Sequence, residues 1–192
     1  PQLIGENPMD IDRLWNKIFR MFSYMGSRGF TTSLTAGFDI ALWDIKGKVS
    51  GLPVYDLLGG RYRDPVRLYC NAWFNGCFTP EEYANAAKIN VLENGHTACK
   101  LDPFLEMTQY HTMYQDGFIS EEGEQLGYDI VAAVRETVGP EIEILIDAHG
   151  HYNVPNAVRI SNNLFERFNI AWFEEPVPPE GINALKQVKQ NT

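Results

Sequence analysis

The spacing of apolar residues changes once along the chain, from a helical rhythm to an alternation of strands and helices. Apolar side chains recur every three to four residues over 7–25 and again over 32–48, which predicts two amphipathic helices. Asn7 and Pro8 suit the start of the first helix. A short helical turn is expected in 53–60, ending at a glycine pair. The inward face of the second helix is predicted to carry Leu34, Phe38, Ala41, Leu42 and Ile45.

From residue 63 onward the pattern predicts four strands, at 66–73, 97–101, 141–147 and 170–175. Helices are expected between them at 79–95, 120–138 and 154–168, and one more begins at 181. Thr79 and Glu82 form a capping-box signature with a proline between them. Strand–helix alternation predicts a parallel sheet with right-handed crossovers.

Two architectures fit this alternation, an open doubly wound sheet and a (β/α)8 barrel. No glycine-rich phosphate loop follows the first strand, which weakens a nucleotide-binding interpretation. Polar residues follow each strand, and the active sites of barrels are built at that end. The fold class expected is therefore α/β, with the first half of a (β/α)8 TIM-type barrel preceded by helices.

The composition of the chain argues against some classes of partner. Its 192 residues are 44% hydrophobic and carry a net charge of −9. Such a charge argues against nucleic acid, because no basic stripe is present to release counterions. No apolar run of about 18 residues exists, so no membrane span is expected. The first ten residues lack the features of a signal peptide, and the three cysteines form no CxxC motif. A cytoplasmic protein is predicted.

Two acidic residues at the ends of neighbouring strands are candidate metal ligands. Asp147 ends the third predicted strand and Glu174 lies at the end of the fourth, about 5 Å away in the sheet direction. Carboxylates this close repel unless they are protonated or bridged by a cation, and oxygen ligands suit magnesium. The alternative for Asp147 is a cap of the following turn, and for Glu174 a surface ion pair.

A histidine and a lysine stand beside these acids. His149 follows Asp147 by two positions, so both side chains project the same way if the extended geometry persists; the alternative is a structural histidine in a loop. Lys100 follows an apolar strand, and a buried lysine needs a partner. A structural ion pair with Asp102 is its alternative. Trp73, at the end of the first strand with Asn71, lines a site or simply packs.

Several longer motifs resemble one known family. The stretches GFDIALWDIKGK and GLPVYDLLGG, the strand regions HTACKLDPF and ILIDAHGHYN, and the run AWFEEPVPPE resemble the mandelate racemase and muconate-lactonizing branch of the enolase superfamily. The resemblance implies that 1–62 is the helical part of an N-terminal α+β capping domain. It implies that 63–192 is a partial barrel with strands 1–4.

The resemblance also implies roles for individual residues. Asp147 and Glu174 match the first two magnesium ligands, while the third ligand and a histidine base are expected beyond Thr192. His149 matches the general acid of members that dehydrate sugar acids. Lys100 is expected to contact the substrate carboxylate, with Asp102, Asn71 and Trp73 as further substrate-binding residues. Asp102 stands where the family usually has a second lysine, which argues against racemase or cycloisomerase chemistry based on that lysine.

The function implied is a Mg²⁺-dependent sugar-acid dehydratase, a hydro-lyase. It would remove the proton next to a carboxylate, pass through an enediolate stabilised by the cation, and expel the β-hydroxyl with a proton from the imidazole. The alternatives are a racemase or epimerase of the same family and a non-catalytic half barrel. The loop at 103–119 reaches over the pocket or is a surface excursion. A homo-oligomer acting on a small sugar-acid carboxylate is expected, and the sequence leaves the particular acid open.

Overall fold

The computed structural model describes residues 2–26, 28–104, 114–115 and 117–192, and the chain divides into two compact units. The first unit covers Pro1–Val66 and the second Arg67–Thr192. Most of the predicted loop at 103–119 lies outside the described residues, so its position over a pocket stays a prediction. No helix in the described part of the chain is long and apolar enough to cross a membrane.

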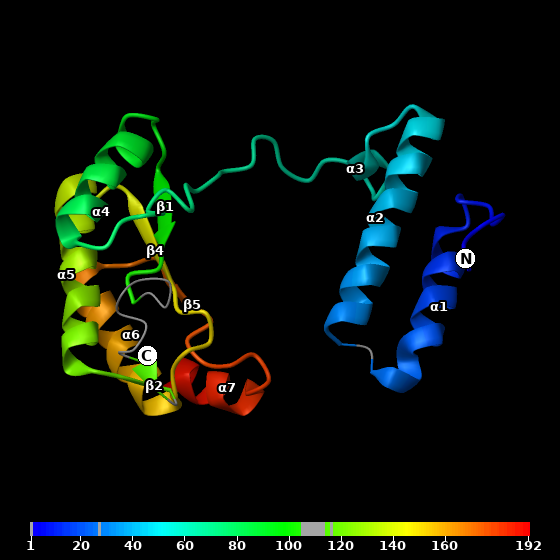
Figure 1. The fold of residues 1–192 in the computed structure, drawn as a ribbon. Helices are drawn as coiled ribbons and strands as arrows, with labels where there is room; N and C mark the ends of the chain where they lie inside the picture. Colours follow the sequence, from blue (N-terminus) through cyan, green and yellow to red (C-terminus); the bar gives the residue numbers. More distant parts are fainter. Residues whose placement is uncertain (1, 27, 105–113, 116) are drawn as a thin grey trace. The chain divides into compact units, whose positions relative to one another are not determined.

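The first unit is helical (Figure 1), with α1 at Ile11–Phe22, a 3-10 turn η1 at Ser23–Met25, α2 at Phe30–Ser50 and α3 at Val54–Leu57. The helix α1 lies beside α2, and their contact buries Ile11, Leu14 and Leu42. The predicted start of α1 near Pro8 was wrong. The Asn7 side chain accepts a hydrogen bond from the Met9 N–H instead, which holds a turn ahead of the helix.

The predicted inward face of α2 is only partly buried in this unit. Leu42 is buried, but Leu34, Phe38 and Ile45 are 40%, 41% and 38% exposed. The neighbouring helices α1 and α3 cover only part of the apolar surface of α2. The sequence prediction was therefore right about the helix and incomplete about its burial.

The second unit is built on a parallel sheet of three strands in the order β1-β4-β5. These are Ala98–Leu101, Glu143–Asp147 and Trp172–Glu174. The predicted strand at 66–73 was wrong in its length: only Cys70 pairs, through a parallel bridge to Cys99. An antiparallel pair of two-residue strands, β2 (Tyr114–Gln115) and β3 (Phe118–Ile119), was not predicted.

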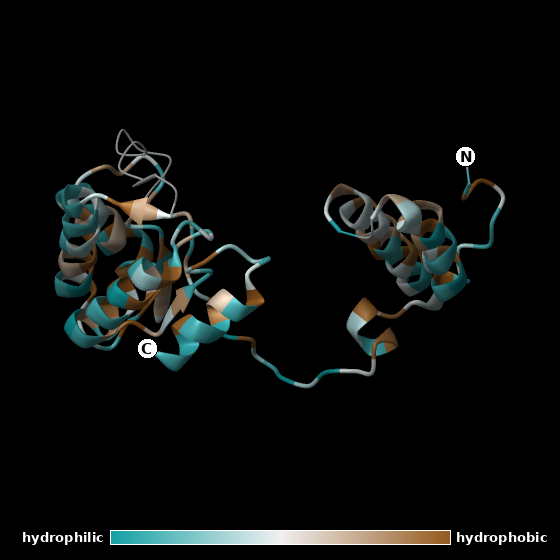
Figure 2. Ribbon diagram, turned by 90° about the horizontal axis from the view of Figure 1, so that it is seen from below, coloured by the Kyte–Doolittle hydropathy of each residue, from teal (hydrophilic) through white to brown (hydrophobic). Residues whose placement is uncertain are grey.

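Helices α4, α5 and α6 lie on one side of the sheet (Figure 1). They span Pro80–Ala87, Glu121–Val138 and Val154–Phe168; α4 continues as a π-helical turn η2 at Lys88–Leu92, and α7 spans Ile182–Gln190. Thr79 and Glu82 form the predicted capping box at α4. In Figure 2 the helices of this unit carry both hydrophilic and hydrophobic residues, as helices with one buried face do.

The pleat of the strands separates two sets of side chains. Cys99 and Leu101 of β1 and Ile144 and Ile146 of β4 belong to the hydrophobic core. The alternate positions face the other way, and the register pairs Lys100 with Leu145 and Asp147 with Glu174. The sheet therefore carries its lysine and its two strand-end acids together, on the face opposite the core.

Candidate active site

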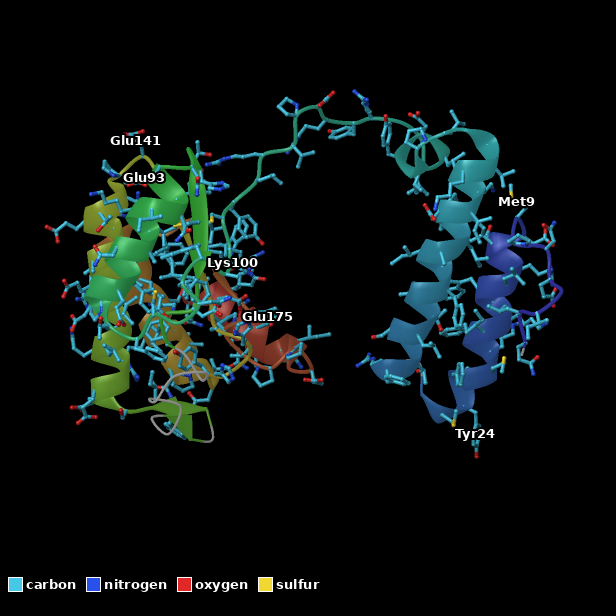
Figure 3. All side chains as sticks on the ribbon, turned by 45° about the horizontal axis from the view of Figure 1, so that its top comes forward. Met9, Tyr24, Glu93, Lys100, Glu141 and Glu175 are labelled. Carbon is cyan, nitrogen blue, oxygen red and sulfur yellow. The ribbon has the colours of Figure 1, made fainter. Side chains whose placement is uncertain are left out.

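Lys100 joins the two strand-end acids through its ammonium group. The Lys100 Nζ lies 2.8 Å from Asp147 Oδ2 and 3.0 Å from Glu174 Oε2. The side chains of Lys100 and Asp147 are 9% and 6% exposed, and that of Glu174 is 36% exposed. Figure 3 shows Lys100 beside the sheet of the second unit, in the region where Glu175 also lies. The two carboxylates thus converge on one positive charge.

The shared contacts favour the charged forms of Lys100 and Asp147. Burial by itself lowers the pKa of the Lys100 ammonium, but the hydrogen bonds and charges of Asp147 and Glu174 outweigh it and hold that pKa above its ordinary range. Burial raises the pKa of the Asp147 carboxyl. The hydrogen bonds from Lys100 and from the His149 backbone more than offset this, so its pKa lies below its usual value.

The imidazole of His149 reaches Asp147 by a turn rather than along an extended strand. The strand β4 ends at Asp147, and His149 has a left-handed backbone with φ of 48°. The His149 N–H donates to Asp147 Oδ1 at 3.1 Å, so Asp147 does cap the turn as its alternative interpretation held. The other carboxylate oxygen, Oδ2, faces Lys100 and also lies 3.5 Å from His149 Nε2. The extended geometry assumed from the sequence was wrong, but the two groups still meet.

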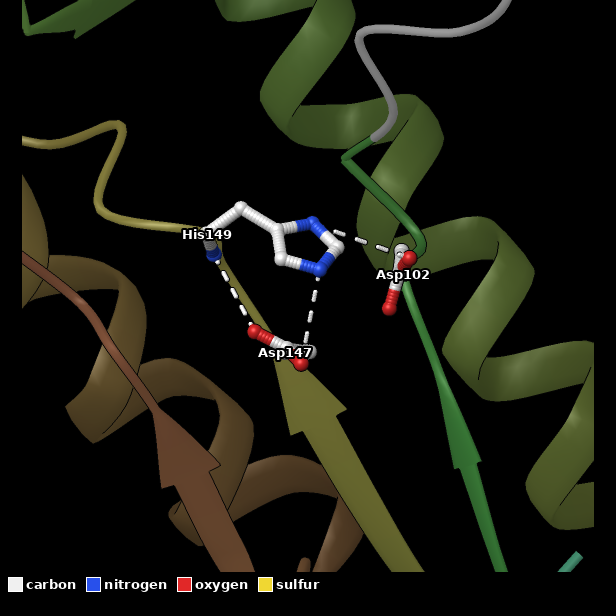
Figure 4. Close-up of side chains that lie close together, drawn as sticks. All are labelled: Asp102, Asp147 and His149. Carbon is white, nitrogen blue, oxygen red and sulfur yellow. Dashed lines mark hydrogen bonds and ion pairs between the residues drawn. The ribbon is translucent and has the colours of Figure 1, made fainter. Parts of the chain in front are cut away.

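Asp102 lies on the other side of the same imidazole (Figure 4). Its Oδ2 is 3.7 Å from His149 Nδ1, and its side chain is 16% exposed. Burial raises the pKa of the Asp102 carboxyl above its ordinary value, although the electrostatic effect of His149 acts to lower it. The hydrogen bonds of Lys100 go to Asp147 and Glu174, so a Lys100–Asp102 pair is not the arrangement found.

The other predicted substrate residues lie at different depths. Trp73 is 8% exposed within the core, and its Nε1 donates to the Lys100 carbonyl at 2.9 Å. Its surroundings are therefore those of a packing residue. Asn71 is exposed, and its side-chain oxygen accepts from the Ala72 N–H. Substrate contact by either residue stays a prediction.

Sequence reasoning missed Tyr69. Its ring centroid is 5.8 Å from Lys100 Nζ, and the ring meets Trp172 edge-on at 5.9 Å. The alternation of side chains between the two faces of a strand could have indicated Tyr69. Cys70 pairs with Cys99 on the core side, so the preceding residue, Tyr69, lies on the face that carries Lys100.

Comparison with known proteins places the chain in a family. Residues 82–192 match the model of the enolase C-terminal domain-like family, and residues 1–59 match the N-terminal domain of mandelate racemase / muconate lactonizing enzyme. The chain belongs to the enolase superfamily. The resemblance inferred from the sequence motifs is confirmed, as is the α/β fold class with half of a barrel.

Alignments with similar proteins cover nearly the whole chain. D-gluconate dehydratase of Thermoproteus tenax is 36% identical over 193 residues, which cover 98% of this chain and 36% of the relative. D-galactarolactone cycloisomerase of Agrobacterium fabrum is 35% identical over 188 residues, covering 97% and 45%. A mandelate racemase/muconate lactonizing protein from Paracoccus denitrificans, solved in complex with magnesium, is 30% identical with a TM-score of 0.80, covering 97% and 47%. The chain thus spans less than half of the length of these relatives.

The donor set of this superfamily chain suits a hard divalent cation. Asp147 Oδ2 and Glu174 Oε2 already face one cationic group, and carboxylate oxygens are the ligands that Mg²⁺ prefers. A second grouping shares Asp147: single ligand atoms of Asp102, Asp147 and His149 lie within 4.8 Å of one another. The first pair fits magnesium better because it offers only oxygen, whereas the second includes an imidazole nitrogen.

Proposed function

We propose that the protein carrying this chain is a divalent-cation-dependent dehydratase of sugar acids. The observation that carries the proposal is the convergence of Asp147 and Glu174 on one point of positive charge, with the His149 imidazole 3.5 Å from the first carboxylate. The similarity to D-gluconate dehydratase supports a sugar acid as substrate.

In the proposed reaction the C–H bond next to the substrate carboxylate breaks and a base takes the proton. The C–O bond of the neighbouring hydroxyl then breaks, and the hydroxyl leaves as water with a proton from His149. The resulting enol becomes a 2-keto acid, so atoms balance as sugar acid to keto acid plus water. Bound Mg²⁺, held by Asp147 and Glu174, would supply charge stabilisation to the substrate carboxylate.

The chain's own residues have three distinct tasks in this scheme. Asp147 orients His149 by accepting its backbone N–H, which fixes the turn that carries the imidazole. His149 is 52% exposed, so its ring is open to a ligand above the strand ends. Lys100 supplies a positive charge for the substrate carboxylate, and Asp102, Asn71 and Trp73 remain candidates for substrate contact.

The test compares His149→Asn with wild type in the full-length protein that carries this sequence. Wild type is expected to convert at least one acid in a panel of gluconate, galactonate and mannonate to a 2-keto acid in the presence of Mg²⁺. The variant should lose about 10²–10⁴-fold in dehydration, the usual contribution of a general acid. It should still exchange the substrate's α-proton with D₂O, because the acid acts after that proton has left.

A matched control is His96→Asn. His96 precedes β1, at the end of the sheet opposite Asp147, so its replacement should leave dehydration at the wild-type rate. An equal loss in both variants, or no keto acid from any substrate, would remove the dehydratase assignment. Absence of all turnover would favour the non-catalytic half barrel.

Proton transfer without loss of water is the second candidate function, as in a racemase, an epimerase or a cycloisomerase. The similarity to D-galactarolactone cycloisomerase favours it. Deuterium incorporation or isomer formation by wild type, with no keto acid, would select this function over dehydration.

A further inference from the structure

Lys100 occupies the point on which the two acids converge, and its backbone is fixed there. The Lys100 N–H donates to the Cys70 carbonyl at 2.8 Å, and its own carbonyl accepts from Trp73 Nε1 at 2.9 Å. Both peptide groups are thus held by neighbouring segments, and only the four-carbon side chain is free to move.

An ammonium and a divalent cation cannot share this point. Mg²⁺ binds carboxylate oxygens at about 2.0–2.1 Å, closer than the 2.8 Å and 3.0 Å that separate the ammonium from the same two oxygens. With both present, two positive charges would lie within about 4 Å of each other, where like charges repel strongly in a poorly hydrated site. Occupation by one therefore requires the other to leave.

A second favourable position for the ammonium lies nearby, over the Tyr69 ring. Lys100 Nζ is already within 5.8 Å of the Tyr69 ring centroid, and Tyr69 is 41% exposed. A lysine ammonium can rest over an aromatic face at this range, so a short swing of the side chain would keep a favourable contact while clearing both carboxylates.

We propose that Lys100 is the internal counter-cation of the metal-free site, and that a divalent cation displaces its ammonium from Asp147 and Glu174 toward Tyr69. This inference rests on the proposed cation site. It makes binding ordered: the cation enters first, and only then is the lysine charge free for the carboxylate of the substrate. The lysine also competes with the cation, which weakens the affinity of the site.

The first test measures how fast Lys100 reacts in the full-length wild-type protein. Lysines are methylated with formaldehyde and a borane, and the products are read by peptide mass spectrometry. One sample contains a chelator, and a second contains saturating Mg²⁺ as the sole added ligand. Lys100 methylation should rise several-fold with Mg²⁺, because the ammonium leaves a position in which the Lys100 side chain is 9% exposed. Lys48, which is 75% exposed and paired with Asp44, is the internal control and should react equally in both conditions.

The second test measures Mg²⁺ affinity by calorimetry without substrate. Lys100→Met should bind Mg²⁺ about tenfold more tightly than wild type, within the usual range of coupling between two exclusive ligands. Lys48→Met is the matched control and should bind as wild type does. Should Lys100→Met fail to fold, the methylation experiment on the wild type decides alone.

The outcomes separate the two proposals. If Mg²⁺ binds but Lys100 methylation is unchanged or falls, or if a folded Lys100→Met gains no affinity, displacement is overturned and the cation site stands. If Mg²⁺ binds neither wild type nor variant, the cation site and the displacement are both overturned. Faster methylation together with tighter binding supports the inference.

Discussion

Neutralising Asp147 tests the shared ion pair directly through the stability of the metal-free protein. Asp147→Asn preserves the shape of the side chain and leaves an oxygen for the His149 N–H. It removes the charge that faces Lys100 and places an amide there. The change therefore isolates the contact between Asp147 and the ammonium from the turn that the same residue caps.

The expected magnitude follows from the geometry. At 2.8 Å and an effective dielectric constant of about 20, the attraction between Asp147 and Lys100 is about 6 kcal/mol, most of it offset by the desolvation of the two charges. Removal of one partner of a buried pair costs about 3–5 kcal/mol when the other is left alone. Glu174 still contacts Lys100 at 3.0 Å, so we expect Asp147→Asn to destabilise the protein by about 2 kcal/mol.

The assay is urea unfolding at pH 7 with a chelator, in the wild-type and Lys100→Met backgrounds. Without the lysine, Asp147 and Glu174 repel each other, so the same Asp147→Asn change should now stabilise the protein by about 1 kcal/mol. The coupling energy of this cycle is then about 3 kcal/mol. An Asp147→Asn effect of the same sign and size in both backgrounds would refute the shared ion pair.

Three further predictions concern packing, hydrogen bonding and charge at residues other than those of the candidate site. Gly127→Ala would place a Cβ 2.2 Å from the buried Phe104 ring and should lower the free energy of unfolding in urea by about 1–3 kcal/mol. Gly37→Ala, whose Cβ would have no atom within 4 Å, is the control and should stabilise its helix by about 0.5–1 kcal/mol. Arg135→Met removes the donors to four backbone carbonyls and should lower the free energy of unfolding by about 2–4 kcal/mol. Arg135→Lys should restore only part of this stability, because an ammonium cannot reproduce the planar guanidinium contacts. Hydrogen bonds from neighbouring basic side chains lower the pKa of Glu6 from 4.5 to about 2, so its stabilising effect is present above pH 4.5 and lost as pH falls toward 2; a carboxyl ¹³C NMR midpoint near 4.5 would contradict this.

The helices of the second unit and the strands β1, β4 and β5 were predictable because their sequence patterns are local. The helix α6 was predicted with its observed bounds, and the capping box at Thr79 is visible in four consecutive letters. The strand predicted at 66–73 failed because pairing is not a local property: its alternation is that of a strand, but only Cys70 finds a partner. The inward face of α2 failed for a similar reason, since burial depends on which neighbour covers it.

The placement of the strand-end side chains on one face was predictable from the sequence, but their contacts were not. Strand ends and alternation brought Asp147, Glu174 and Lys100 to one face, because these features are fixed by the period of a β-strand. The partner of the lysine was not fixed in this way. Asp102, two residues away in sequence, was the nearest candidate, yet Lys100 reaches across the sheet to two other strands.

The different partner of Lys100 changes what Asp102 is available to do. With the ammonium held by Asp147 and Glu174, the Asp102 carboxylate faces the imidazole of His149, with Oδ2 at 3.7 Å from Nδ1. An acid at this position therefore does not duplicate the lysine expected from family resemblance but faces the group proposed to protonate the leaving hydroxyl. A lysine in its place would bring a positive charge toward this ring instead of a carboxylate. Asp102 and His149 thus face each other in the candidate site, an arrangement that supports the proposed dehydration rather than the proton transfer that a second lysine would serve.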